Sequence, residues 1–132
     1  NMRLGISKDL GYTANERSEN LRRASEVARL INISGLICIC AFVAPSVDVR
    51  EKARNLIGKD RFLEIYLTAS KEICRQRDVN GVYGKAEKGE LKEFPGVSAP
   101  YDVPGSPDLV LDTDKLKIEE CVDRIIRLLE SK

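Results

Sequence analysis

The chain has 132 residues and a mass of 14.8 kDa, and 42% of its residues are hydrophobic, which is enough for one domain with a buried core. Its 22 Lys and Arg against 21 Asp and Glu leave a formal net charge of +1, so the chain carries no overall basic field that would bind nucleic acid. The longest apolar run, residues 36–44, is far shorter than the roughly 20 residues of a membrane helix. Since no signal-peptide pattern opens the chain, we expect a cytoplasmic protein that binds neither nucleic acid nor membranes.

Histidine is absent from the sequence. This absence excludes catalysis by an imidazole base, including Ser-His-Asp and Cys-His hydrolysis. The four cysteines form no Cys-x2-Cys pair of the kind that binds zinc, so we expect no metal ligands among them.

A helix is predicted over residues 14–32. Thr13 and Glu16 have the spacing of a capping box, in which each side chain accepts a hydrogen bond from a first-turn amide. Leu21, Ala24 and Ala28 then begin an apolar series at helical spacing.

The rest of the chain alternates between predicted strands and helices. Residues 36–43 are continuously apolar and end before Pro45, which is typical of a strand covered on both faces. Further strands are predicted over 62–67 and 109–111, with helices over 47–57, 71–77 and about 118–129. Three strands between helices predict an α/β fold with a doubly wound parallel sheet, formed by a single domain over residues 1–132.

Residues 79–106 match none of these elements. The segment is rich in glycine and proline and has no sustained apolar period. A long insert without regular structure in a small domain is often functional, and its aromatic and apolar side chains could dock onto a ligand site. We therefore expect residues 79–106 to form a lid.

The residues themselves favour a nucleotide site only modestly. Arg17 and Asn20 share one face of the first predicted helix, and Arg77 stands at the entrance to the lid. Guanidinium groups there could bind phosphates, although charged surface side chains are common. The phosphate-loop motif G-x-x-x-x-G-K-[ST] is missing from the 132 residues, since Gly58-Lys59 and Gly84-Lys85 are followed by Asp60 and Ala86.

Several motifs, taken together, resemble one family along essentially the whole chain. They are Asp9-Leu10-Gly11-Tyr12, Arg17-Ser18-Glu19-Asn20-Leu21-Arg22-Arg23, Phe42-Val43-Ala44-Pro45, Cys74-Arg75-Gln76-Arg77-Asp78, Gly81-Val82-Tyr83 and Gly89-Glu90-Leu91-Lys92. The chain resembles adenylylsulfate kinase, a phosphate-loop kinase. This resemblance implies a phosphate-loop NTPase fold and transfer of the γ-phosphoryl group of MgATP to the 3′-hydroxyl of adenylyl sulfate, giving 3′-phosphoadenylyl sulfate and ADP.

The resemblance also implies roles for particular residues. Tyr12 and Phe94 match an aromatic pair around the adenine of adenylyl sulfate, while Arg77 and Thr113 match residues of the ATP site. The full set matching the adenylyl sulfate site is Arg3, Tyr12, Arg17, Asn20, Val43, Lys92 and Phe94. The cofactors implied are ATP and Mg²⁺, and the family is commonly dimeric and is sometimes fused to or associated with an ATP sulfurylase.

The chain also departs from the family. The first strand, the phosphate loop and the following Asp-Gly-Asp are absent, and the catalytic residues are therefore unknown and expected upstream of Asn1 in a longer polypeptide. Ala44 replaces a serine, and Gly84 and Glu87 replace basic lid residues. Two hypotheses stay open: a segment of a kinase, inactive by itself, or a non-catalytic module that binds adenylyl sulfate or a nucleotide and has lost its phosphate loop.

Overall fold

The computed structural model describes residues 2–91 and 94–132. Its elements are η1 (Met2–Leu4), α1 (Ala14–Ile33), α2 (Val47–Ile57), η2 (Lys59–Arg61), β1 (Ile65–Thr68), α3 (Lys71–Gln76), α4 (Val82–Glu87), β2 (Leu109–Asp112) and α5 (Ile118–Glu130). They fall into two compact units, the first drawn from Asn1–Phe62 and Lys92–Val103 and the second from Leu63–Leu91 and Pro104–Lys132. None of the described helices combines the length and apolar character that crossing a membrane requires.

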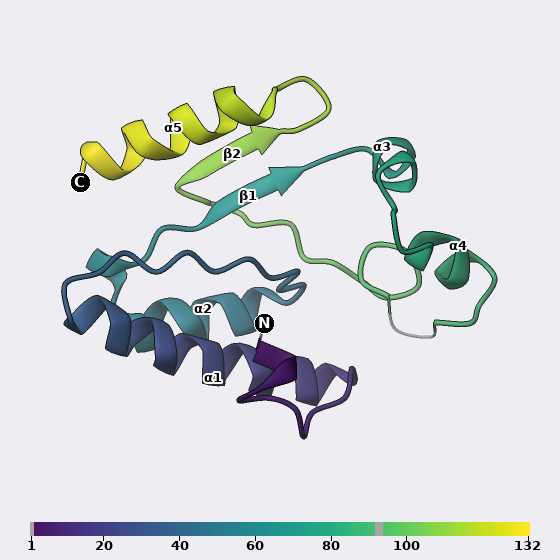
Figure 1. Cartoon of the computed structure of the whole chain (residues 1–132), viewed down its shortest axis with the longest axis horizontal. Coiled ribbons are helices and arrows are strands. Elements are labelled where there is room, and N and C mark those ends of the chain that lie inside the picture. The colour runs from purple at the N-terminus through teal and green to yellow at the C-terminus, as the bar shows by residue number, and fades with distance from the viewer. Residues whose placement is uncertain (1, 92–93) are drawn as a thin grey trace. The chain divides into compact units, whose positions relative to one another are not determined.

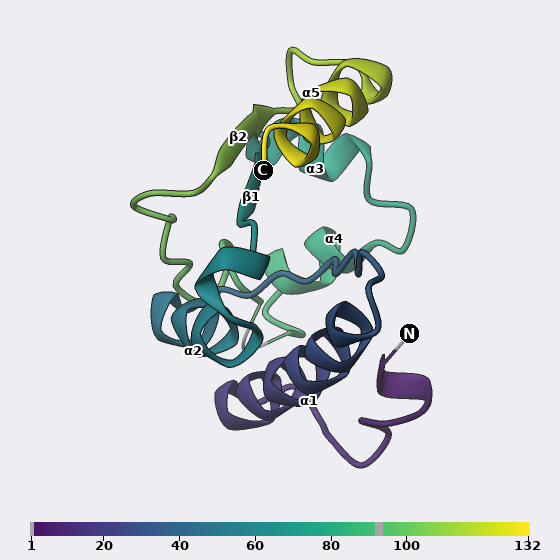
Figure 2. The same ribbon diagram turned by 90° about the vertical axis from the view of Figure 1, so that its left-hand side faces the viewer.

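The first unit is built on α1 and α2, which lie side by side (Figures 1 and 2). The predicted capping box is confirmed, because Thr13 accepts a hydrogen bond from the Glu16 amide and the Glu16 carboxylate accepts one from the Thr13 amide. Ala24 and Ala28 are buried one turn apart on α1, where their small side chains allow close packing. The predicted bounds of α2, residues 47–57, agree with the structure.

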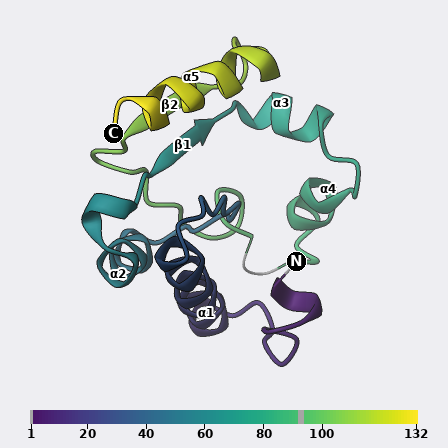
Figure 3. The same ribbon diagram turned by 60° about the vertical axis from the view of Figure 1, so that its left-hand side comes forward.

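The second unit contains a parallel pair of strands. Ile65 of β1 pairs with Leu109 of β2, and the register runs on to Thr68 and Asp112. The α5 helix packs on β2 (Figure 3), and Leu111 is fully buried. The parallel pairing and the helix after β2 confirm the predicted α/β class.

The expectation of a strand over residues 36–43 is wrong. This segment has no ladder partner among the described residues, and the described part of its own unit holds no strand with which it could pair. Because a strand exists only through hydrogen bonds to a neighbour, an apolar run cannot form one by composition alone. Leu36, Ile39 and Val43 are accordingly exposed.

The expectation that residues 79–106 contain no regular element is wrong for Val82–Glu87, which form α4. Gly81 precedes the helix with a φ of 65°, a left-handed conformation that glycine adopts without strain. The Asp78 carboxylate accepts a hydrogen bond from the Tyr83 amide at 2.8 Å and so satisfies a first-turn donor. These local contacts start a helix that the apolar pattern does not reveal.

Candidate functional site

The first unit contains a pocket of about 420 Å³. Three segments form its walls: the N-terminal half of α1, the turn that leads into α2, and residues 98–102. The lining residues are Ala14, Arg17, Ser18, Leu21, Pro45, Ser46, Val49, Ser98, Ala99, Pro100 and Asp102. A concave site with an apolar floor and a few polar groups is the usual form of a small-molecule site.

Two arginines hold the turn that precedes α1. Arg3 Nη1 donates to the carbonyl oxygen of Leu10 at 3.1 Å and also to that of Gly11. The Arg3 guanidinium lies 4.2 Å from the centre of the Tyr12 ring, and Arg17 Nη1 donates to the Tyr12 carbonyl. The structure thus brings together three of the residues expected at the adenylyl sulfate site, Arg3, Tyr12 and Arg17.

A second arginine cluster fixes the same turn to α1. Arg23 binds both carboxylate oxygens of Asp9, at 2.6 and 2.8 Å, and donates to the Ile6 carbonyl and to Glu19. Hydrogen bonds from Arg22 and Arg23 lower the pKa of Glu19 to about 2, and the bond from Arg23 lowers the pKa of Asp9. These ion pairs connect the Asp9–Tyr12 motif with the Arg17–Arg23 motif, so each motif restrains the other.

The other residues expected at the adenylyl sulfate site differ in burial and in whether they lie near the pocket. Asn20 is 5% exposed, and its Oδ1 has no hydrogen-bond partner within residues 2–91 and 94–132. Val43 is exposed and does not line the pocket, although Pro45 and Ser46 do. Phe94 begins a tight turn in which its carbonyl accepts hydrogen bonds from the amides of residues 97–99, whereas Lys92 lies outside the described residues.

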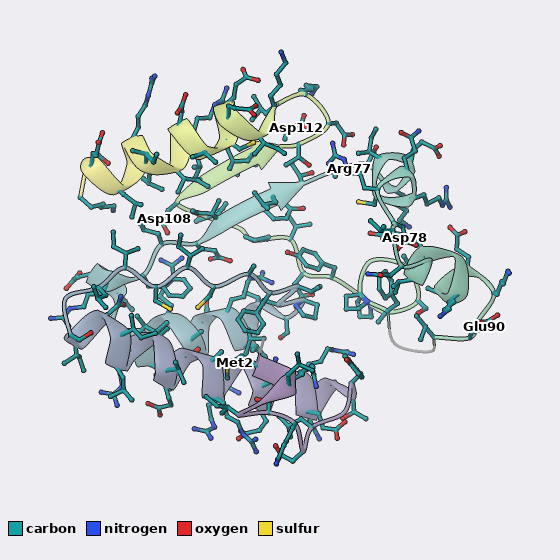
Figure 4. The ribbon with its side chains drawn as sticks, in the orientation of Figure 1. Met2, Arg77, Asp78, Glu90, Asp108 and Asp112 are labelled. Carbon is teal, nitrogen blue, oxygen red and sulfur yellow. The ribbon has the colours of Figure 1, made fainter. Side chains whose placement is uncertain are left out.

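In the second unit, Arg77 and Thr113 lie together at the carboxyl ends of the strands, near Asp112 (Figure 4). Arg77 donates to the Thr113 side chain at 3.1 Å and to its carbonyl at 2.8 Å. The Thr113 hydroxyl donates in turn to the carbonyl of Thr68, the last residue of β1. Both residues expected at the ATP site therefore form one connected group, at the edge of a parallel sheet where ligands usually bind.

Sequence reasoning missed much of the pocket wall. Ser46, Ser98 and Asp102 belong to no motif, and their proximity depends on contacts between segments more than 50 residues apart. The proline and glycine residues around Ser98 indicate a turn, but they do not say against which helix it packs.

The parallel strands with their flanking helices define an α/β protein, and the match to a solved APS kinase structure makes its fold one of the phosphate-loop kinase type. Residues 1–112 match the adenylylsulphate kinase family model. The chain belongs to the adenylylsulphate kinase family, as its motifs predict.

Two curated relatives and one solved structure illustrate the similarity. The chain is 50% identical over 131 residues to the bifunctional enzyme CysN/CysC of Rhodopirellula baltica, covering 99% of this chain and 20% of the relative. It is 48% identical over 132 residues to an adenylyl-sulfate kinase of Bacteroides thetaiotaomicron, covering all of this chain and 66% of the relative. The structure of the Mycobacterium tuberculosis APS kinase CysC in complex with AMPPNP and APS matches with a TM-score of 0.91 at 36% identity, over 98% of this chain and 75% of that one.

Proposed function

We propose that the protein containing these residues is an adenylyl-sulfate kinase, which transfers the γ-phosphoryl group of ATP to the 3′-hydroxyl of adenylyl sulfate in sulfate assimilation. The observation that carries the proposal is the pocket beside α1, which Arg17 lines and which adjoins the turn bearing Arg3 and Tyr12. The relatives' names and the APS complex of the solved structure support it.

In this proposal, Arg3 and Arg17 bind the anionic part of adenylyl sulfate. Both guanidinium groups now donate to backbone carbonyls of the turn at residues 10–12. A phosphate or sulfate oxygen carries a negative charge that a carbonyl oxygen lacks, so it forms an ion pair with the guanidinium as well as a hydrogen bond, often in a bidentate geometry. Binding would therefore redirect donors that are already close to the pocket. Tyr12 and Phe94 are assigned to the adenine, and Asn20, Val43 and Lys92 complete the proposed substrate set.

ATP is assigned to the group formed by Arg77 and Thr113. Phosphoryl transfer depends mainly on positioning and on neutralising charge that develops on the phosphate oxygens. A guanidinium already fixed by two hydrogen bonds to Thr113 is suited to hold a nucleotide in a defined position.

The described residues supply no preformed metal site. Within the described ranges 2–91 and 94–132, no group of three or more Cys, Asp or Glu side chains could hold a metal ion. We therefore assign no Mg²⁺ ligand among the described residues and derive no step through the ion. MgATP remains the proposed phosphoryl donor, with its metal ligands expected in a phosphate loop.

The finer features predicted from the sequence stay proposals. They are a cytoplasmic location, a homodimer, and fusion to or association with an ATP sulfurylase. The relative from Rhodopirellula baltica, named a bifunctional enzyme, supports fusion to a second enzyme, because this chain covers only 20% of its length.

The test is formation of 3′-phosphoadenylyl sulfate and ADP from adenylyl sulfate and MgATP by the protein in which these residues occur. We expect equimolar products and loss of activity when adenylyl sulfate is omitted. Binding of adenylyl sulfate without any product would instead support the alternative, a binding module that has lost its phosphate loop. Absence of both binding and turnover would overturn the proposal.

A further inference from the structure

Asp102 joins the segment of residues 94–103 to the start of α2. Its amide donates to the Pro45 carbonyl at 2.8 Å, and its carboxylate accepts a hydrogen bond from the Val47 amide at 3.1 Å. Val47 is the first residue of α2, and Ser46, at the capping position, makes no side-chain capping bond. Asp102 thus supplies, from a distant part of the chain, the acceptor and negative charge that favour a helix N-terminus.

Arg50 reinforces the same junction from within α2. Its side chain donates to the Ala44 carbonyl at 2.8 Å and to the Asp102 carbonyl at 2.7 Å, and its guanidinium carbon lies 5.9 Å from the centre of the Tyr101 ring. Arg50 is only 8% exposed, and arginine is rarely so buried without hydrogen-bonded partners. We call these contacts of Arg50 and Asp102 the Arg50–Asp102 clasp.

The clasp also restrains an unusual backbone conformation. Ala44 has a φ of 41°, in the left-handed region that a residue with a side chain adopts only at a cost. Such conformations persist where surrounding contacts fix them, and Arg50 binds the carbonyl of this same residue. The two following residues, Pro45 and Ser46, line the pocket.

We propose that Arg50 is a positioning residue for adenylyl sulfate. Through the clasp it holds the wall formed by residues 98–102 against the wall formed by Pro45, Ser46 and Val49, so that the pocket exists before substrate arrives. Arg50 does not line the pocket itself and acts through the two walls. This inference rests on the proposed function for the identity of the ligand. It further implies that the part of the predicted lid after Phe94 is a fixed wall, and that ligand-dependent movement is confined to earlier residues of the lid.

Hydrogen exchange without ligand tests the clasp independently of catalysis. Arg50→Met keeps an unbranched, largely apolar side chain and removes the guanidinium donors. We expect the amides of Val47 and Asp102 to exchange about tenfold faster in this variant, because hydrogen bonds from a charged group are lost. Arg54→Met is the matched control on the same helix, since the Arg54 guanidinium lies 5.0 Å from the Phe62 ring and outside the clasp. Equal exchange at Val47 and Asp102 in Arg50→Met and in the unsubstituted protein would overturn the proposal.

Kinetics of the protein that carries these residues test the positioning role. We expect Arg50→Met to raise KM for adenylyl sulfate about tenfold while kcat changes less than about twofold, because the wall is lost and the reacting groups are unchanged. Arg50→Lys can still donate to one carbonyl, so its KM should lie between the values of Arg50→Met and of the unsubstituted protein. Arg54→Met should leave KM unchanged. Faster exchange with an unchanged KM would overturn the positioning role. Absence of turnover in every form would count against the proposed function. The affinity of each form for adenylyl sulfate, measured by calorimetry, would then replace KM as the test of the role of Arg50.

Discussion

At the scale of single residues, Gly11 shows how little room the turn before α1 leaves. A Cβ at this position would lie 2.8 Å from Glu16 Oε2, and the Glu16 carboxylate is held by hydrogen bonds from the Gly11 amide and the Thr13 amide and hydroxyl. We expect Gly11→Ala to displace Glu16, weaken the cap and lower the thermal unfolding midpoint by about 3–6 °C. Gly5→Ala is the matched control, since no atom lies within 4 Å of its added Cβ. Equal midpoints for the two variants would show that the turn adapts freely.

The second prediction at this scale concerns the aromatic pair, Tyr12 and Phe94. Phe94→Ala should weaken binding of adenylyl sulfate by about 1–3 kcal/mol, the usual contribution of an aromatic ring stacked on a base. Tyr12, which is 71% exposed with the Arg3 guanidinium near its ring, has room for the same stacking. Calorimetric titration of each variant with adenylyl sulfate measures the effect, with ATP affinity as the control. An unchanged affinity in Phe94→Ala would remove this residue from the site.

Glu19 gives a prediction for pH dependence. Its folded pKa, about 2, is lower than the ordinary 4.5, because Arg22 and Arg23 stabilise the carboxylate. A depressed folded pKa stabilises the native state at pH values above the unfolded pKa, and this stabilisation is lost as pH falls through the folded value. The protein should therefore unfold at a higher urea concentration than Glu19→Gln at pH 6, and the difference should shrink between pH 4.5 and about 2. A difference that is constant over this range would contradict the ion-pair explanation.

At the scale of elements, the predicted lid divides into segments with different restraints. The α4 helix has six residues and depends on Asp78 and Gly81 for its start, and short helices of this kind are close to marginal stability. We expect amide exchange in Val82–Glu87 to slow when adenylyl sulfate and a nucleotide analogue are bound together. The amides of α5 provide the internal reference. The lid hypothesis fails if exchange in α4 is the same with and without both ligands.

Also at this scale, the first helix illustrates why some elements are predictable. Its start follows from Thr13 and Glu16, which lie three positions apart and contact each other through local geometry. Its buried face follows from alanines at helical spacing. The segment 36–43 has an equally clear apolar pattern but forms no strand among the described residues, because a strand requires a partner that the pattern itself does not supply.

At the scale of the whole molecule, we expect the 132 residues by themselves to lack kinase activity. The charge that develops on the β- and γ-phosphates requires a backbone cradle, a lysine and a hydroxyl that binds Mg²⁺. The G-x-x-x-x-G-K-[ST] motif that provides these groups does not occur in this sequence. The measurement is product formation from adenylyl sulfate and MgATP by the 132 residues alone and by the protein in which they occur. Comparable rates of product formation by the two would refute the expectation that the phosphate-loop groups are required.

The sequence by itself determined the family, the α/β class, the two longest helices and the identity of most residues that we assign to the two ligands. These features depend on local spacing, on capping residues and on short motifs, all of which are properties of neighbouring residues. Arg77 and Thr113 were thus assigned individually to the ATP site. Their hydrogen bonds to one another join positions 36 residues apart, and only the tertiary structure decided that contact.

Contacts between positions far apart in the sequence also explain what the sequence did not reveal about the pocket. Arg50 lies in a predicted helix, where a lone arginine is expected to face solvent, and Asp102 lies in a loop without a recognisable motif. The two residues meet across 52 positions, and their contacts bury the arginine, cap α2 and hold the pocket wall formed by residues 98–102. Contacts between distant segments leave no periodic or local signature in a single sequence, and the three-dimensional packing of α1, α2 and residues 94–103 therefore decided them.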